Sequence, residues 1–137
     1  LHPVAHSFPT RRSSDLTGSP EGMNISTPFD ARLFMVGGKM VAAMIRKSPK
    51  KSEWKANIHA GAIPLPYDPP SDVVNLAERA VKTMDLDIAG VDIMYSSKED
   101  DWMVLEVNCG PGWTGLSKVT DRNIPVEIAR YFKKIIT

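Results

Sequence analysis

Residues 88–112 read IAGVDIMYSSKEDDWMVLEVNCGPG and contain two apolar segments separated by a polar one. The segments 88–95 and 102–107 are rich in Val, Ile, Leu and Met, a composition typical of β-strands. The residues between them are polar or charged, as in a hairpin loop. The pattern predicts an antiparallel β-hairpin that is symmetric about Glu99.

This hairpin is expected to gather oxygen ligands on one face. Side chains alternate along a strand, so Glu106 and Asn108 share a face, roughly 6–7 Å apart. The symmetry also places Asp92 opposite Glu106, with Cβ atoms about 5 Å apart. Two carboxylates this close repel each other unless a cation lies between them, and hard oxygen ligands favour Mg²⁺ or Mn²⁺. We predict a metal site formed by Asp92, Glu106 and Asn108; the alternative is a solvated polar surface at the strand end.

Length, charge and cysteine content limit the classes of protein to which this chain can belong. A chain of 137 residues is one domain or part of a larger one. We find in it no apolar run long enough to cross a membrane and no apolar segment of a secretory signal. The single cysteine, Cys109, excludes an intrachain disulfide and a Cys-rich metal site. The single cysteine also fits a reducing cytosol, so we expect a cytoplasmic protein, without a membrane partner. A formal net charge of +1 gives no general attraction to nucleic acid, so we expect no nucleic-acid partner.

The N-terminal residues form a separate case. The chain begins with Leu rather than Met, and residues 6–16, HSFPTRRSSDL, resemble one translated reading frame of a widely used DNA-sequencing adapter. We expect residues 1–16 to be an assembly artefact, residues 1–22 to be non-native or disordered, and the domain to occupy residues 23–137. The competing interpretation is a genuine basic Ser/Arg tail that is disordered or binds anions.

A second hairpin is predicted around Gly37-Gly38. This dipeptide separates two apolar segments, ARLFMV at 31–36 and MVAAMIR at 40–46. Gly-Gly tolerates the positive φ angles of tight turns, so the two segments are expected to pair as antiparallel strands.

Residues 54–61, WKANIHAG, follow a charged loop and have the composition of a short strand. Lys55, Asn57 and His59 recur at every second position, which places all three on one face. A polar face of this kind is typical of a site lining, although a lone histidine is more often structural.

Two helices complete the pattern. Ser71 is a good N-cap, and apolar residues at helical spacing predict an amphipathic helix at 72–84. Pro125 suits the first turn of a second amphipathic helix at 125–136. The loop at 109–115 has three glycines and a proline, so it is either a plain turn or a backbone that can approach a ligand closely. The order hairpin, helix, hairpin, helix indicates an α+β fold, an antiparallel sheet covered by helices on one face.

Taken together, these motifs resemble the C-terminal lobe of an ATP-grasp ligase of the RimK type, an α-L-glutamate ligase-like group. The matching pieces are D-x-R (Asp30, Arg32), VGGKMVAAMIR (36–46), WKAN (54–57), HAG (59–61), AGVDI (89–93), LEVN (105–108) and PGWTGL (111–116). They follow the family's order at close to its spacing and cover about residues 25–136.

The resemblance implies a reaction and a set of site residues. Enzymes of this family use ATP to phosphorylate a carboxylate, and an amine then attacks the acylphosphate to form an amide; relatives add glutamate or another amino acid. The implied cofactors are ATP and two Mg²⁺ or Mn²⁺ ions, one held by Asp92 and Glu106 and the other by Glu106 and Asn108. Arg46 would face the phosphoryl groups and stabilise charge in the transition state. The implied nucleotide contacts are Asp30, Lys55, Ala56, Asn57 and, on the adenine ring, Leu105.

The chain also departs from the family pattern. Lys55 replaces an arginine that is common there, so a two-pronged contact becomes a point charge. The family's smaller lobe, adenine hinge and preceding substrate domain are absent, so we expect a fragment that is inactive alone. The alternatives are a non-catalytic nucleotide- or partner-binding module, or another ATP-grasp enzyme such as a D-alanine–D-alanine ligase or a glutathione synthetase relative. The expected partners are an amino-acid donor and a carboxylate acceptor (small molecule, peptide or protein tail), and a homo-oligomer stays open.

Overall fold

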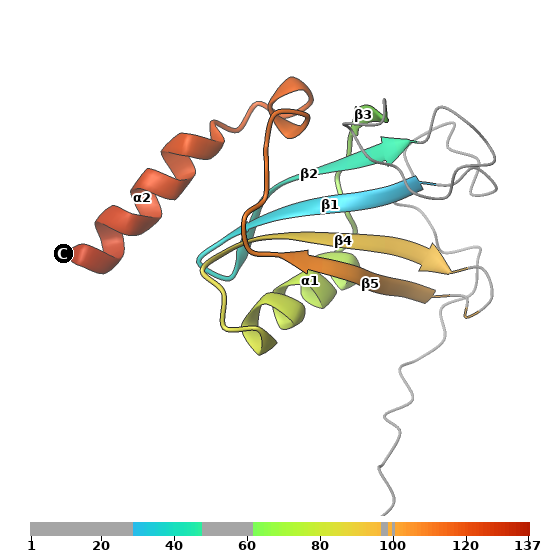
Figure 1. Cartoon of the computed structure of the whole chain (residues 1–137), viewed down its shortest axis with the longest axis horizontal. Helices are drawn as coiled ribbons and strands as arrows, with labels where there is room; N and C mark the ends of the chain where they lie inside the picture. Colours follow the sequence, from blue (N-terminus) through green and yellow to red (C-terminus); the bar gives the residue numbers. More distant parts are fainter. Residues whose placement is uncertain (1–28, 48–61, 97–98, 100) are drawn as a thin grey trace, which may run out of the picture.

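One antiparallel sheet organises the fold. The computed structural model describes residues 29–47, 62–96, 99 and 101–137. Its five strands lie in the spatial order β3-β2-β1-β4-β5, and every neighbouring pair is antiparallel (Figure 1). The strands are β1 (Phe29–Val36), β2 (Lys39–Lys47), β3 (Ile63–Pro66), β4 (Ile88–Ser96) and β5 (Asp101–Asn108).

Both predicted hairpins are present. β1 and β2 turn at Gly37 and Gly38, whose φ angles of +60° and +76° lie in the left-handed region that favours glycine. β4 pairs with β5 and also with β1, so the two hairpins lie side by side. The strand β3 was not predicted, because it lies in a proline-rich segment. As the edge strand of the sheet, β3 can contain Pro64 and Pro66, which cannot donate ladder hydrogen bonds.

The helix α1 (Ser71–Thr83) covers one face of the sheet. It buries Val73, Ala77 and Val81 completely. The sheet residues that pack against them occupy alternate positions of the strands: Ala31, Leu33, Met35, Ala43, Ile45, Ala89, Val91 and Ile93. The helix predicted at 72–84 is therefore confirmed. The predicted cap is wrong, because the helix already begins at Ser71 and Pro70 occupies the N-cap position with an extended backbone.

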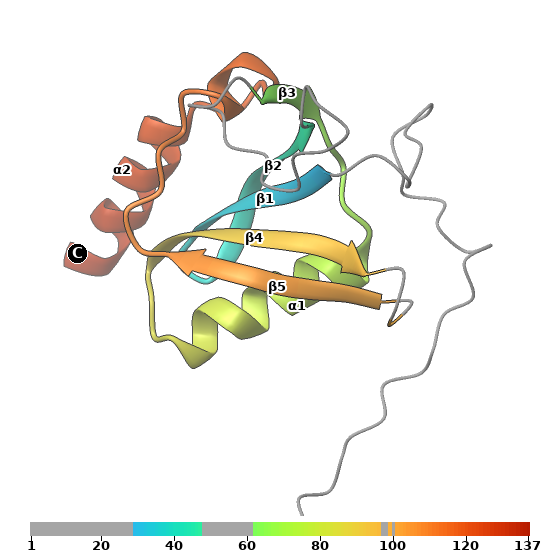
Figure 2. The ribbon, with the colours of Figure 1, turned by 45° about the vertical axis from the view of Figure 1, so that its right-hand side comes forward.

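The opposite face carries a second core beneath the short 3-10 helix η3 (Leu116–Lys118) and the helix α2 (Ile124–Ile136). This core consists of Phe34, Val36, Ala42, Met44, Leu116 and Ile124. The expectation that both helices cover one face is wrong. Neighbouring residues of β1 enter different cores, so this central strand needs cover on both faces. Figure 2 shows α1 along β4 and β5, and α2 apart from it beside the β1–β2 turn.

The helix α2 is attached at the turn between β1 and β2. The Tyr131 hydroxyl donates a hydrogen bond to the Asp87 carboxylate. The Tyr131 ring lies so close to Gly37 that a Cβ atom there would be 2.5 Å from a ring carbon. At the start of the helix, the Asn123 side chain accepts a hydrogen bond from the Val126 backbone, as an N-cap does. In the described part of the chain, no helix is long and apolar enough to cross a membrane.

Candidate functional site

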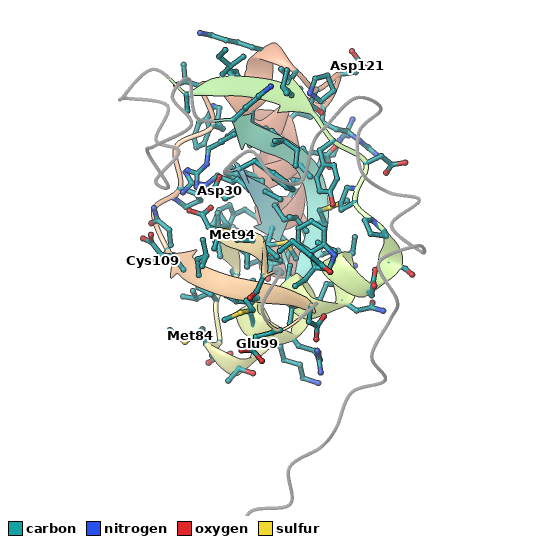
Figure 3. The ribbon with its side chains drawn as sticks, turned by 90° about the vertical axis from the view of Figure 1, so that its right-hand side faces the viewer. Asp30, Met84, Met94, Glu99, Cys109 and Asp121 are labelled. Atoms are coloured by element: carbon teal, nitrogen blue, oxygen red, sulfur yellow. The ribbon has the colours of Figure 1, made fainter. Side chains whose placement is uncertain are left out.

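Charged and polar side chains form a row on the sheet face opposite α1. Side chains alternate along each strand, so the residues between the α1-side core positions point to this face. The row contains Asp30 and Arg32 on β1, Arg46 on β2, Asp92 on β4, and Glu106 and Asn108 on β5. Figure 3 shows Asp30 on the face that is turned away from α1.

The strand register brings these residues together from distant parts of the chain. Arg32 lies opposite Asp92 in the pairing of β1 with β4, and Asp30 lies opposite Arg46 in the pairing of β1 with β2. On the other side of β4, Asp92 lies opposite Glu106. The predicted pairing of the two carboxylates across the hairpin is therefore confirmed.

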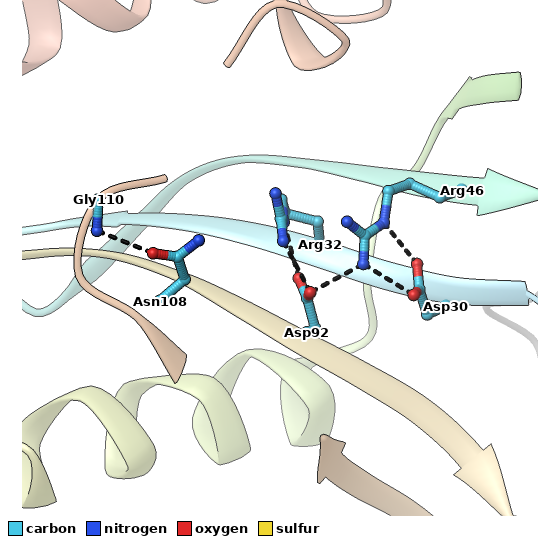
Figure 4. A network of polar contacts seen from close by, with 6 residues as sticks. All are labelled: Asp30, Arg32, Arg46, Asp92, Asn108 and Gly110. Carbon is cyan, nitrogen blue, oxygen red and sulfur yellow. Dashed lines mark hydrogen bonds and ion pairs between the residues drawn. The ribbon is translucent and has the colours of Figure 1, made fainter. Parts of the chain in front are cut away.

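Four of these side chains form an alternating series of charges, Arg32–Asp92–Arg46–Asp30, which we call the ion chain (Figure 4). Arg32 donates from Nε and Nη2 to the two carboxylate oxygens of Asp92, both at 2.7 Å. Arg46 donates from Nε and Nη2 to the two oxygens of Asp30, at 2.6 and 2.7 Å. Nη2 of Arg46 also donates to Asp92 Oδ2 at 2.8 Å. Asp92 is thus shared by two arginines.

Burial makes the ion chain depend on complete pairing. Asp30, Arg46 and Asp92 are only 8%, 6% and 5% exposed. Burial raises the pKa of Asp30 above its ordinary value, and the hydrogen bonds and charge of Arg46 offset only part of this effect. Burial acts to lower the pKa of Arg46, but its hydrogen bonds and charge interactions with Asp30 and Asp92 outweigh it and raise that pKa. Removal of one partner would leave a buried charge without compensation.

The three predicted metal ligands lie together but are not equally available. Glu106 is exposed and makes no hydrogen bond or ion pair within the described residues. The Asn108 Oδ1 atom accepts a hydrogen bond from the Gly110 backbone at 2.9 Å and keeps a second lone pair. Both oxygens of Asp92 already accept hydrogen bonds from arginines.

The donor set fits a hard cation by its chemistry. Among the described residues, no cluster of three or more His, Cys, Asp or Glu side chains could hold a metal ion. A cation at Asp92 and Glu106 would therefore need the Asn108 amide oxygen to complete the set. Three oxygen donors suit Mg²⁺ or Mn²⁺ better than Zn²⁺. The assignment of these three residues as ligands stays a prediction.

A β-bulge in β5 adds one residue to the sheet face that carries the row, which we call the site face. The register between β4 and β5 shifts between Asp92 and Ile93, so one residue of β5 is extra. Val104 and Val107 both pack against the α1-side core although they are three positions apart. The two residues between them therefore lie on the other face, where Leu105 is 44% exposed next to Glu106. The adenine contact that the resemblance implies for Leu105 stays a prediction, and Leu105 borders the row.

The structure adds Arg32 to the site. The sequence shows Arg32 only as part of the D-x-R motif, and the motif alone assigns it no role. Its partner Asp92 lies 60 positions away, so only the pairing of β1 with β4 reveals the contact. Asp30, predicted as a nucleotide contact, holds Arg46 with both of its oxygens. The remaining predicted residues, Lys55, Ala56, Asn57 and His59, lie outside the described residues.

Comparison with known sequences identifies relatives of this chain. The chain is similar to a protein of Mannheimia succiniciproducens named "Probable alpha-L-glutamate ligase", with 37% identity over 107 residues. That match covers 78% of this chain and 35% of the relative. A protein of Legionella pneumophila with the same name is 37% identical over 107 residues, covering 77% of this chain and 34% of the relative. The chain thus spans about a third of the length of the curated relatives it matches.

Solved structures with the same fold are ATP-grasp ligases. The ligase PsnB, in a complex with a precursor variant, Mg and ADP, superposes with a TM-score of 0.62 at 17% identity, covering 81% of this chain and 33% of PsnB. A RiPP-associated ATP-grasp ligase of Chryseobacterium gregarium, in a complex with ADP and peptides, gives a TM-score of 0.60 at 19% identity, covering 80% and 34%. The sequence profile of the family described as "RimK-like ATP-grasp domain" matches residues 21–132. The chain therefore belongs to the RimK-like ATP-grasp domain family.

Proposed function

We propose that this chain is the metal-binding lobe of an ATP-dependent ligase that joins a carboxylate to an amine. In the proposed reaction a carboxylate oxygen attacks the γ-phosphorus of ATP and ADP leaves. The amine then attacks the acyl carbon, phosphate leaves, and an amide is formed. The family membership supports this proposal, as do relatives named for glutamate ligation and structural neighbours that are ATP-grasp ligases.

The observation that carries the proposal is the mixture of charges on one sheet face. Asp92, Glu106 and Asn108 supply cation-binding oxygens, and Arg46, held by Asp30, supplies a fixed positive charge beside them. A triphosphate needs both kinds of partner, because it carries several negative charges and binds proteins together with Mg²⁺. When bound, two Mg²⁺ ions held by these oxygens would neutralise the phosphate oxygens.

Arg46 is the proposed group for charge stabilisation during phosphoryl transfer. Its Nε and Nη2 atoms are held by Asp30, which fixes the plane of the guanidinium. Nη1 has no hydrogen-bond partner in the described part of the chain and could donate to a phosphoryl oxygen. A donor that is already fixed before the reaction needs little reorganisation in the transition state.

The substrates are proposed from the relatives. We propose an amino-acid donor, with glutamate as the first candidate, because relatives are named for glutamate ligation. The carboxylate acceptor is a small molecule, a peptide or a protein tail, and the solved neighbours with bound peptides favour testing peptides first. Because the chain spans about a third of its relatives, the rest of the ATP and substrate sites is assigned to the remaining parts of a longer protein.

The test uses the longer protein, obtained from the gene that encodes this segment. ADP formation that depends on glutamate and on a peptide acceptor is measured for the wild type, for Glu106→Gln and for Glu99→Gln. Glu106→Gln should lower the rate by about two to three orders of magnitude, because the proposed cations that neutralise the reacting phosphate would lose a charged ligand. Glu99→Gln removes the same charge at the turn of the same hairpin and should leave the rate unchanged. Full activity of Glu106→Gln would refute the proposed site.

A further inference from the structure

Asp92 has two arginine partners that differ in what else holds them. Arg46 makes two hydrogen bonds to Asp30 in addition to its one bond to Asp92. Arg32 makes both of its hydrogen bonds to Asp92. Within the described residues, no other polar group holds the Arg32 guanidinium.

This difference decides which arginine would move if a cation took the Asp92 oxygens. Arg46 would keep its two-pronged contact with Asp30 and its place in the ion chain. Arg32 would lose both of the hydrogen bonds that it makes to described residues. Its side chain is only 14% exposed, so an unpaired guanidinium at that place is unfavourable and a rotation toward solvent is favoured.

Geometry also places Arg32 in direct competition with the cation. Both Asp92 oxygens accept hydrogen bonds from Arg32 at 2.7 Å, and Oδ2 accepts a further bond from Arg46. A carboxylate oxygen offers about two lone pairs, so Oδ2 is already fully used. Oδ1 keeps one lone pair, but it lies beside Arg32 Nε, so a cation that approaches from Glu106 across the β4–β5 pair meets the charge of Arg32 at either oxygen. Among the described residues, Arg32 is the donor without a second partner.

We propose that Arg32 is a positioning residue that holds Asp92 in the cation-free site and is displaced from it when a divalent cation binds. The inference deepens the proposed function and rests on its metal site. It implies that cation binding costs the hydrogen bonds between Arg32 and Asp92, which the ligand residues alone do not indicate. It also assigns different behaviour to two arginines that touch the same carboxylate.

The first experiment observes Arg32 directly. The arginine Nε–H signals of the full ¹⁵N-labelled chain are recorded by NMR during a titration with MgCl₂, and Arg32→Lys identifies the Arg32 signal. With Mg²⁺, the Arg32 Nε–H signal should shift and exchange faster with water, whereas the Arg46 signal should remain protected by Asp30. In Glu106→Gln the Arg32 signal should not respond.

The second experiment measures affinity without any catalytic readout. Binding of Mn²⁺ alone is followed from the electron paramagnetic resonance signal of the free ion. Arg32→Gln should bind Mn²⁺ about five- to twentyfold more tightly than the wild type, the size of a typical coupling between two competing interactions. Arg32→Lys keeps the charge but loses the two-pronged contact, and should give a smaller increase. Arg122→Gln removes a cation whose side chain is 64% exposed and should leave the affinity unchanged, which controls for net charge.

Each result decides the inference. Cation binding that depends on Glu106 but leaves the Arg32 signal unchanged would overturn it without touching the proposed ligase, which the ADP-formation assay tests separately. Unchanged or weaker Mn²⁺ binding in both Arg32 variants would overturn it as well, because Arg32 would then support the cation site instead of competing for it. An absence of Glu106-dependent cation binding in every variant would overturn the inference for this chain and remove the metal site on which it rests.

Discussion

At the scale of single residues, charge balance gives Asp92 and Glu106 different roles. The ion chain contains two carboxylates and two guanidiniums, so its formal charges cancel. Glu106 lies beside it across the β4–β5 pair, is exposed, and supplies an excess negative charge. A cation from solvent would therefore meet Glu106 first and reach Asp92 only by competing with Arg32. Residues that look alike in the sequence are inequivalent because one of them is already neutralised.

Asp30 is expected to contribute strongly to stability. Asp30→Asn should lower the free energy of unfolding by about 3 kcal/mol, because the buried Arg46 charge would lose its two-pronged carboxylate partner and keep its one hydrogen bond to Asp92. Urea denaturation followed by circular dichroism measures this change. Asp121→Asn makes the same substitution at an exposed position and should stay within about 0.5 kcal/mol of the wild type. Equal stabilities of the two variants would show that the Asp30–Arg46 pair contributes little.

The sequence could predict only those contacts that arise within one hairpin. The pairing of Asp92 with Glu106 follows from a short symmetric loop, so it was accessible from composition and spacing. The contact of Arg32 with Asp92 requires β1 to pair with β4, which are separated by β2, β3 and α1. No local pattern states that pairing. The sequence could therefore not predict that arginines already pair with both oxygens of Asp92.

At the scale of elements, the bulge in β5 has no evident structural purpose. Removal of the extra residue would restore one continuous register with β4 and would leave Val104 and Val107 on the core face. Glu106 and Asn108 would also keep their face. The bulge therefore costs regular pairing and adds only the exposed Leu105 side chain to the site face. Bulges of this kind are common beside functional sites.

Deletion of Leu105 separates its two effects. We expect the free energy of unfolding to change by less than about 1 kcal/mol, because an exposed side chain and an irregular pairing are lost together. We expect ADP binding by the longer protein to weaken, because the proposed adenine contact is lost. Urea denaturation and calorimetric titration with ADP measure the two quantities. Leu105→Ala, which keeps the bulge, should weaken ADP binding as well. Unchanged ADP binding in both variants would contradict the adenine contact.

The β1–β2 turn contains two glycines that provide a matched pair of variants. Both have positive φ, but a Cβ atom at Gly37 would collide with the Tyr131 ring, whereas at Gly38 it would meet nothing within 4 Å. Alanine at either position should cost about 1 kcal/mol of backbone strain. Gly37→Ala should cost more and should also increase hydrogen exchange in α2, because Tyr131 must move. Identical exchange of α2 in the two variants would show that the Tyr131 contact does not hold the helix.

At the scale of the whole molecule, the two cores explain why one expectation about the fold failed. The predicted helices were correct in position, because apolar spacing is a local signal. Their placement on one face was wrong, because the apolar runs of β1 and β2 are continuous and bury both faces of the sheet. A continuous apolar run indicates that a strand is central in the sheet, but it does not indicate which helix covers which face.

The same two-sided organisation leaves apolar surface on the outside of α2. Phe132, Ile135 and Ile136 are 41%, 53% and 79% exposed, although the inner side of the helix packs on the sheet. An exposed apolar helix face favours association. We therefore predict that the isolated chain self-associates, with an apparent mass by light scattering that rises with protein concentration. The double variant Ile135→Gln, Ile136→Gln should reduce this rise, whereas Lys133→Gln, Lys134→Gln on the same turn should not. A monomer at every concentration would mean that the apolar side of α2 is too small to bind a second copy.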